Sequence, residues 1–139
     1  MRILLSILPD VLGPDLKIVF CGTAAGRKSA DLGYYYAGNG NKFWKTLFST
    51  GLTPRLLLPS EFRELIAWGI GLTDMVKDKS GMDSSLVRND FKNNGLVEKI
   101  RKYSPKILCF NGKKAAKEFY GYDRVEYGLQ EKGVYDTRI

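Results

Sequence analysis

The sequence contains no histidine and only two cysteines among its 139 residues. The absence of histidine excludes catalysis by a histidine base and disfavours a zinc site. The cysteines, Cys21 and Cys109, both lie inside apolar runs, which is typical of buried thiols in a reducing compartment rather than of a disulfide pair. The chain also lacks the G-x-G-x-x-G and G-K-[ST] patterns of nucleotide-binding loops.

Long apolar segments are missing as well. Residues 1–8 are apolar, but Pro9 and Asp10 end the run, so it is too short to cross a membrane and carries no cleavage pattern. We therefore expect a cytoplasmic protein that does not associate with a membrane. The length predicts a single domain, 1–139. The 22 Lys and Arg against 15 Asp and Glu, a net charge of +7, suit a partner that carries phosphates.

Strand and helix patterns alternate along the chain. Apolar runs predict strands at 16–21, 70–76 and 106–110, and amphipathic spacing predicts helices at 41–50, 59–68, 91–103 and 113–120. Residues 2–12 form a short helix or an irregular lead-in, and residues 77–88 form a polar surface loop. The expected fold is a three-layer α/β/α domain with a mostly parallel central sheet of about four strands.

Helical spacing also predicts which side chains face the core. The expected inward-facing residues are Phe43, Trp44, Leu47, Phe48, Phe62, Leu65, Ile66, Leu96, Ile100 and Tyr103. Lys99, Arg101 and Lys102 are expected to face solvent. Gly51 is expected to end the helix at 41–50.

The stretch 18–44 dominates the sequence. A buried strand runs into the small-residue loop 22–26, which is followed by three consecutive tyrosines, an amide-rich turn at 38–41 and the pair Phe43-Trp44. Small residues after a strand let a ligand approach the backbone closely. Together these features predict a pocket at the carboxyl end of a parallel strand, where open α/β sheets bind ligands.

The motifs of this stretch resemble those of a known family. A strand followed by G-x-x-x-G-x-x-S-A and then by aromatic-A-x-x-x-N-x-F-W is similar to the mismatch-specific uracil/thymine DNA glycosylases of the uracil-DNA glycosylase superfamily. The resemblance continues through residues 51–53, 69–76 and 111–113 and covers roughly Leu8 to the end. It implies a monomeric DNA glycosylase of base-excision repair, with no metal and no cofactor. The implied substrate is double-stranded DNA with a deaminated or mismatched base, which is flipped out of the helix before hydrolysis.

The resemblance also predicts which residues line the base pocket, and it shows where this sequence departs from the family's motif. By this resemblance, backbone N–H groups of Gly22, Thr23 and Ala24 line the base pocket. Tyr36 either stacks on the flipped base or packs in the core, and core packing is the more expected role for Tyr34. The family usually carries Asn-Pro where this chain has Ala24-Ala25, and that asparagine positions the attacking water. The chain ends before the position of the family's last strand and wedge loop, so we expect either a fragment or a chain that has lost activity.

Two polar residues are candidates to replace the missing amide. Asn41, in the N-x-F-W block, either holds water or reads the base edge, or it caps the following helix, or it does both. Asp74 either orients and deprotonates the water while stabilising positive charge on the sugar, or it is an exposed turn or cap aspartate. The apolar residues Ile70 and Leu72 before it favour a place at the pocket rim.

A third group of residues is expected to contact DNA. Its members are Arg27, Lys28, Ser29, Asn111, Lys113 and Lys114. Backbone N–H groups at the start of the helix at 113–120 can bind a phosphate. The alternatives are solvated charge for Arg27 and Lys28, an N-cap for Ser29, and a simple helix start at 111–114.

Three functions remain open from the sequence. The first is an active DNA glycosylase, the second is a catalytically inactive remnant that binds DNA or a base, and the third is an unrelated α/β nucleotide-binding module. The first two share a fold and differ only in activity.

Overall fold

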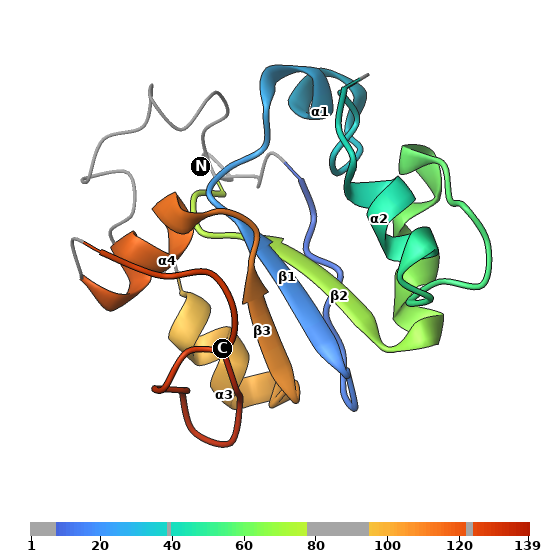
Figure 1. Ribbon diagram of the computed structural model, residues 1–139. Coiled ribbons are helices and arrows are strands. Elements are labelled where there is room, and N and C mark those ends of the chain that lie inside the picture. Colours follow the sequence, from blue (N-terminus) through green and yellow to red (C-terminus); the bar gives the residue numbers. More distant parts are fainter. Residues whose placement is uncertain (1–7, 39, 78–94, 122–123) are drawn as a thin grey trace, which may run out of the picture.

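The computed structural model describes residues 8–38, 40–77, 95–121 and 124–139 (Figure 1). The elements are β1 (Ile18–Gly22), α1 (Arg27–Leu32), α2 (Phe43–Ser49), the 3-10 helix η1 (Pro59–Trp68), β2 (Ile70–Asp74), α3 (Leu96–Tyr103), β3 (Ile107–Phe110) and α4 (Lys113–Tyr120). This confirms the predicted α/β class. All of the predicted loop at 77–88 except Lys77, and the first residues of the predicted helix at 91–103, lie outside the described residues.

The sheet is parallel and has the order β2-β1-β3. Its described part has three strands where about four were expected, and a parallel bridge between Ile107 and Arg138 marks the place of a fourth. On the opposite edge, Val11 pairs in the antiparallel sense with Leu72. This pairing ties the lead-in to β2.

Helices cover both faces of the sheet (Figure 1). On one face, Ile70 and Leu72 pack with Phe43 and Leu47 of α2 and with apolar residues of η1. On the other face, Val19, Cys21 and Leu108 pack with Leu96 and Ile100 of α3 and with Ala115 of α4. Alternate strand residues therefore feed two separate cores, as a sheet that is covered on both sides requires. No helix among the described residues is long and apolar enough to span a membrane.

Two predicted core residues are exposed instead. Ile66 is 44% exposed because η1 is a 3-10 helix, whose three residues per turn align Phe62 with Leu65 and turn Ile66 outward. Phe48 is 47% exposed because it lies in the last turn of the short helix α2. Gly51 follows this helix with a φ of 81°, as its predicted role in ending the helix requires.

Two further features differ from the sequence expectation. Helix α1 was not predicted, because its six residues, RKSADL, carry no apolar periodicity. Lys99 does not point freely into solvent, since its ammonium group forms an ion pair with Asp10 at 2.7 Å. Its partner lies 89 positions earlier, so helical periodicity could not reveal it.

Gly71 in β2 offers a test of the packing between the lead-in and the sheet. A Cβ atom there would lie 2.6 Å from the Val11 carbonyl oxygen and 2.8 Å from the Leu16 Cδ1 atom. Because backbone cannot give way easily, Gly71→Ala should lower the free energy of unfolding by about 1–3 kcal/mol in urea titrations. The control is Gly40→Ala, whose Cβ would meet nothing within 4 Å. Equal stability of the two variants would contradict this packing.

Candidate active site

The carboxyl ends of β1 and β2 place Gly22 directly opposite Asp74. Both belong to the sheet face that carries Phe20 and Leu72. A Cβ atom on Gly22 would lie only 2.8 Å from the Asp74 Oδ1 atom and 3.5 Å from the Tyr36 hydroxyl oxygen. The missing side chain at Gly22 therefore makes the space in which a carboxylate and a phenol approach the same backbone position.

A cavity of about 910 Å³ opens above this point. Its size is within the range of about 300–1,000 Å³ that is usual for ligand pockets. The predicted site residues that line it are Gly22, Thr23, Ala24, Arg27, Lys28, Ser29, Tyr36, Asn41, Asp74 and Asn111. Lys113 and Lys114 do not line it. The structure thus brings both candidate catalytic residues and the predicted base pocket together at one place.

Asp74 is buried, with only 5% of its surface exposed, which excludes the exposed turn or cap aspartate considered from the sequence. Burial, with a smaller contribution from the charge of Asp10, raises the pKa of its carboxyl to about 6 against the opposing effects of Lys77 and Lys99. The group is therefore largely ionised at neutral pH and still close enough in pKa to exchange protons there. This combination suits a general base.

Tyr36 is held in an unusual backbone conformation, with a φ of 52°. Two bonds fix the chain around it: the Ala37 N–H donates to Ser29 Oγ at 3.0 Å, and Trp44 Nε1 donates to the Tyr35 carbonyl oxygen at 3.1 Å. Helices α1 and α2 thus hold this segment from two sides. Strain of this kind persists only where the surroundings fix it, and it is frequent at functional sites.

The Tyr36 side chain has a stacked ring and a buried hydroxyl. Its ring stacks on Phe43 with centroids 4.0 Å apart. Its hydroxyl is buried, and the Asn111 side chain lies near it without the geometry of a hydrogen bond. Burial and the charge of Asp74 raise the pKa of Tyr36, and the Asn111 amide only partly opposes them, so the hydroxyl keeps its proton. Tyr34 is only half-buried, and the fully buried member of the tyrosine run is Tyr35.

Asn41 lines the cavity and also supports the start of α2. Its Oδ1 atom accepts a hydrogen bond from the Phe43 N–H at 2.9 Å. This is the capping interaction that the sequence offered as one alternative, although the N-cap position itself is Lys42. The amide nitrogen remains a donor that Asn41 can present to a ligand.

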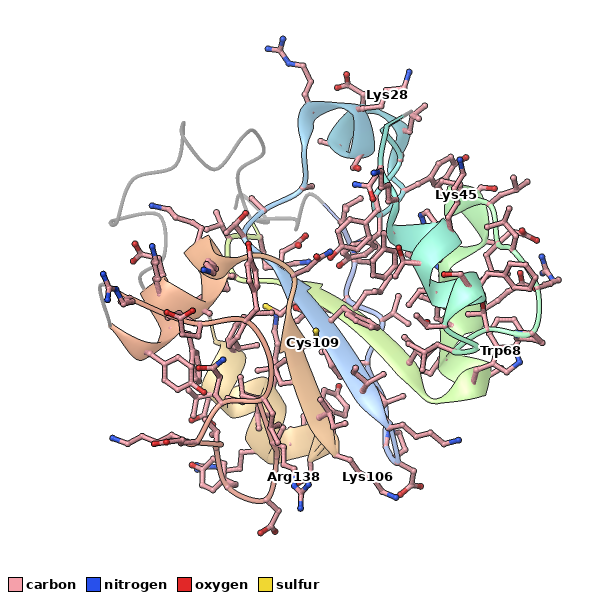
Figure 2. The ribbon with its side chains drawn as sticks, viewed as in Figure 1. Lys28, Lys45, Trp68, Lys106, Cys109 and Arg138 are labelled. Carbon is pink, nitrogen blue, oxygen red and sulfur yellow. The ribbon has the colours of Figure 1, made fainter. Side chains whose placement is uncertain are left out.

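Of the residues predicted to contact DNA, Arg27, Lys28 and Ser29 belong to α1, whereas Lys113 and Lys114 belong to α4. Arg27 and Lys28 are exposed on α1 at the mouth of the cavity. Figure 2 shows Lys28 on this helix, at the top of the view. Ser29 is buried inside α1 and is not its N-cap, which is Gly26. Lys113 lies over the Tyr127 ring at 4.2 Å, and Lys114 forms an ion pair with Glu118 at 3.6 Å.

Four contributors to the site were not expected from the sequence: Phe43, Asp10, Lys77 and Lys99. Phe43 was predicted as core, yet it backs Tyr36 and lines the cavity; its neighbour Asn41 in the N-x-F-W block was the available signal. Asp10 and Lys77 act on Asp74 from segments that no motif connects. No cluster of metal-ligating side chains occurs among the described residues.

Gly22→Ala tests the approach of Asp74 and Tyr36 to the end of β1. The new methyl group should displace the Asp74 carboxylate, because the 2.8 Å contact is shorter than a real Cβ tolerates. We expect chemical-shift changes at Asp74 and Tyr36 in NMR spectra. Gly26→Ala is the matched control in the same loop, since its Cβ would meet nothing within 4 Å. Identical spectra for the Gly22 variant and the wild type would contradict the geometry.

Comparisons with known proteins bear on the family and the fold of the chain. Residues 9–138 match the sequence profile of the uracil DNA glycosylase superfamily. The fold is similar to the solution NMR structure of a candidate uracil DNA glycosylase from Methanosarcina acetivorans, with a TM-score of 0.56 and 26% sequence identity over 83% of this chain and 77% of that one. The chain therefore belongs to the uracil DNA glycosylase superfamily.

Proposed function

We propose that this protein is a monofunctional DNA glycosylase that removes a deaminated base, uracil or hypoxanthine, from double-stranded DNA, including from pairs with G. Superfamily membership supports a DNA glycosylase in general. The observation that carries the specific proposal is the buried Asp74 carboxylate beside the Tyr36 hydroxyl in a cavity at the carboxyl ends of β1 and β2. The base would enter this cavity after it leaves the DNA stack.

The chemistry assigned to Asp74 is hydrolysis of the bond between the base and C1′ of the sugar. The electrons of that bond leave with the base, and a water molecule adds its oxygen to C1′. The proton of the water passes to the Asp74 carboxylate, whose negative charge also stabilises the positive sugar in the transition state. Ala24 carries no polar side chain, so Asp74 takes over the water-holding role.

We assign the recognition of a deaminated base to a hydrogen-bond donor, the Asn41 amide. Deamination replaces an amino group with a carbonyl, so it exchanges a hydrogen-bond donor for an acceptor. The Asn41 side chain lines the cavity, and its amide nitrogen is a hydrogen-bond donor. A donor at this position matches a carbonyl and is left unpaired by an amino group, which disfavours the normal base.

The positive residues at the cavity mouth fit a DNA partner. Arg27 and Lys28 are exposed on α1, next to the Gly22–Gly26 loop. Contacts from such residues to phosphates would position the duplex without reading its sequence. The net charge of +7 acts in the same direction.

The direct test is strand cleavage after alkali on labelled duplexes that hold one uracil, one hypoxanthine or one T opposite G. We expect cleavage at the uracil or hypoxanthine position by the wild-type chain, and no cleavage at undamaged pairs. DNA binding without cleavage of any substrate would contradict the proposal and favour an inactive binding protein.

Asp74→Asn tests the general base. The substitution keeps the shape of the side chain but removes its basicity, so single-turnover excision should fall by about 10²–10⁴-fold. In the wild type, the rate should rise with pH up to about 6 and then level off, because Asp74 must be ionised. Asp15→Asn is the control, since Asp15 is exposed at the other end of the sheet. Full activity of the Asp74 variant would remove Asp74 from the chemistry.

The same variant should change stability in the opposite sense to activity. The folded-state pKa of Asp74 is raised from 3.8 to about 6, so its contribution to stability is present below pH 3.8 and is lost as the pH rises through 6. Asp74→Asn should therefore stabilise the fold at pH 8 by about 1–3 kcal/mol in urea titrations, and by little at pH 4. A gain that does not depend on pH would show that burial of the charge is not its cause.

A further inference from the structure

Three charged residues, Asp10, Lys77 and Lys99, meet next to Thr73 and Tyr35 without lining the cavity, and none of them takes a direct part in the hydrolysis. The Asp10 carboxylate accepts from Lys77 Nζ at 2.9 Å through Oδ1 and from Lys99 Nζ at 2.7 Å through Oδ2. Asp10 precedes β1, Lys77 follows β2, and Lys99 belongs to α3. The side chains are 14–25% exposed, so the ion pairs are shielded from solvent much more than ordinary surface pairs are.

The cluster of Asp10, Lys77 and Lys99 is hydrogen-bonded to two further side chains. The Thr73 hydroxyl donates to Asp10 Oδ1 at 2.7 Å and accepts from Lys99 Nζ at 3.3 Å. Lys77 Nζ donates to the Tyr35 hydroxyl at 3.0 Å. Each of these two residues directly precedes a cavity residue: Thr73 precedes Asp74, and Tyr35 precedes Tyr36.

We propose that Asp10 is a positioning residue for the excision reaction, which holds Asp74 and Tyr36 in place through Lys77, Lys99, Thr73 and Tyr35. This inference rests on the proposed glycosylase function. Asp10 does not line the cavity that holds Asp74, so it acts on the reacting groups only through these neighbours. Lys77 and Lys99 each bind one oxygen of the Asp10 carboxylate. These two ion pairs fix the segments before and after the site relative to each other.

The same cluster sets the charge environment of Asp74. Among the described residues, the ionisable groups that act on Asp74 or feel its charge are Asp10, Cys21, Tyr35, Tyr36, Lys77 and Lys99. The tyrosines and Cys21 have raised pKa values and remain neutral at physiological pH. Within the described part of the chain, the balance is therefore between one anion, Asp10, which raises the pKa of Asp74, and two cations, Lys77 and Lys99, which lower it.

This balance makes opposite predictions for two variants. Asp10→Asn keeps hydrogen-bond capacity but removes the anion, so the pKa of Asp74 should fall. Lys77→Met removes one cation, so the pKa of Asp74 should rise. We expect displacements of about one pH unit in each direction. They are measured twice, by NMR titration of the labelled Asp74 carboxyl carbon and by the acid limb of the excision rate against pH.

Controls separate this role from a general loss of stability. Lys99→Met replaces Lys77→Met if the latter does not fold, since it removes the other cation from the same carboxylate. Lys45→Met and Asp15→Asn make the same chemical changes at exposed positions and should leave both profiles unchanged. A role confined to stability would lower the rate equally at all pH values and would leave the titration of Asp74 in place.

The outcomes distinguish this inference from the proposed function. If the two variants displace the pKa of Asp74 in opposite directions, the role of the cluster is supported. This holds even if the wild type excises no base, and in that case only the proposed function fails. Excision by the wild type combined with displacements in one direction, or with none, would overturn the positioning role and leave the glycosylase proposal intact.

Discussion

The contact between Gly22 and the Asp74 carboxylate is the constraint on which the rest of the site depends. Parallel pairing of β1 with β2 sets the two residues side by side, and any side chain at position 22 would occupy the place of the carboxylate. Burial there keeps the pKa of Asp74 near neutrality. A fold that accepts such a group gives up stability for a reactive carboxylate, as active sites commonly do.

The aromatic wall opposite Asp74 is built by separate means. Tyr36 adopts a left-handed backbone conformation. Two flanking hydrogen bonds hold it there, one from the Ala37 N–H to Ser29 of α1 and one from Trp44 of α2 to the Tyr35 carbonyl oxygen. Phe43 supports its ring from behind. Because α1 and α2 lie on either side of the tyrosine run, the cavity is shaped by the packing of short helices rather than by the sheet alone (Figure 1).

The sequence was informative where local chemistry decides the structure. Apolar runs, together with proline and glycine at the boundaries, predicted η1 and α4 to the residue, although η1 was expected as an α-helix. The strand-loop-tyrosine stretch predicted the cavity, and both Asn41 and Asp74 line it. What sequence could not supply were tertiary partners, because the Asp10 cluster joins segments that are up to 89 positions apart. The role of Ser29 was likewise not evident from the sequence. Its hydroxyl accepts a hydrogen bond from the Ala37 N–H and so holds the Tyr36 segment from inside α1.

The most direct test of the central claim is a crystal structure with a duplex that carries 2′-fluoroarabinouridine, whose glycosidic bond resists hydrolysis. The account predicts that the flipped uracil lies against the Tyr36 ring inside the cavity. It also predicts a water molecule between C1′ and the Asp74 carboxylate, within hydrogen-bond distance of the carboxylate. A base that stays in the DNA stack, or a sugar whose C1′ faces away from Asp74, would contradict the claim that this carboxylate delivers the water.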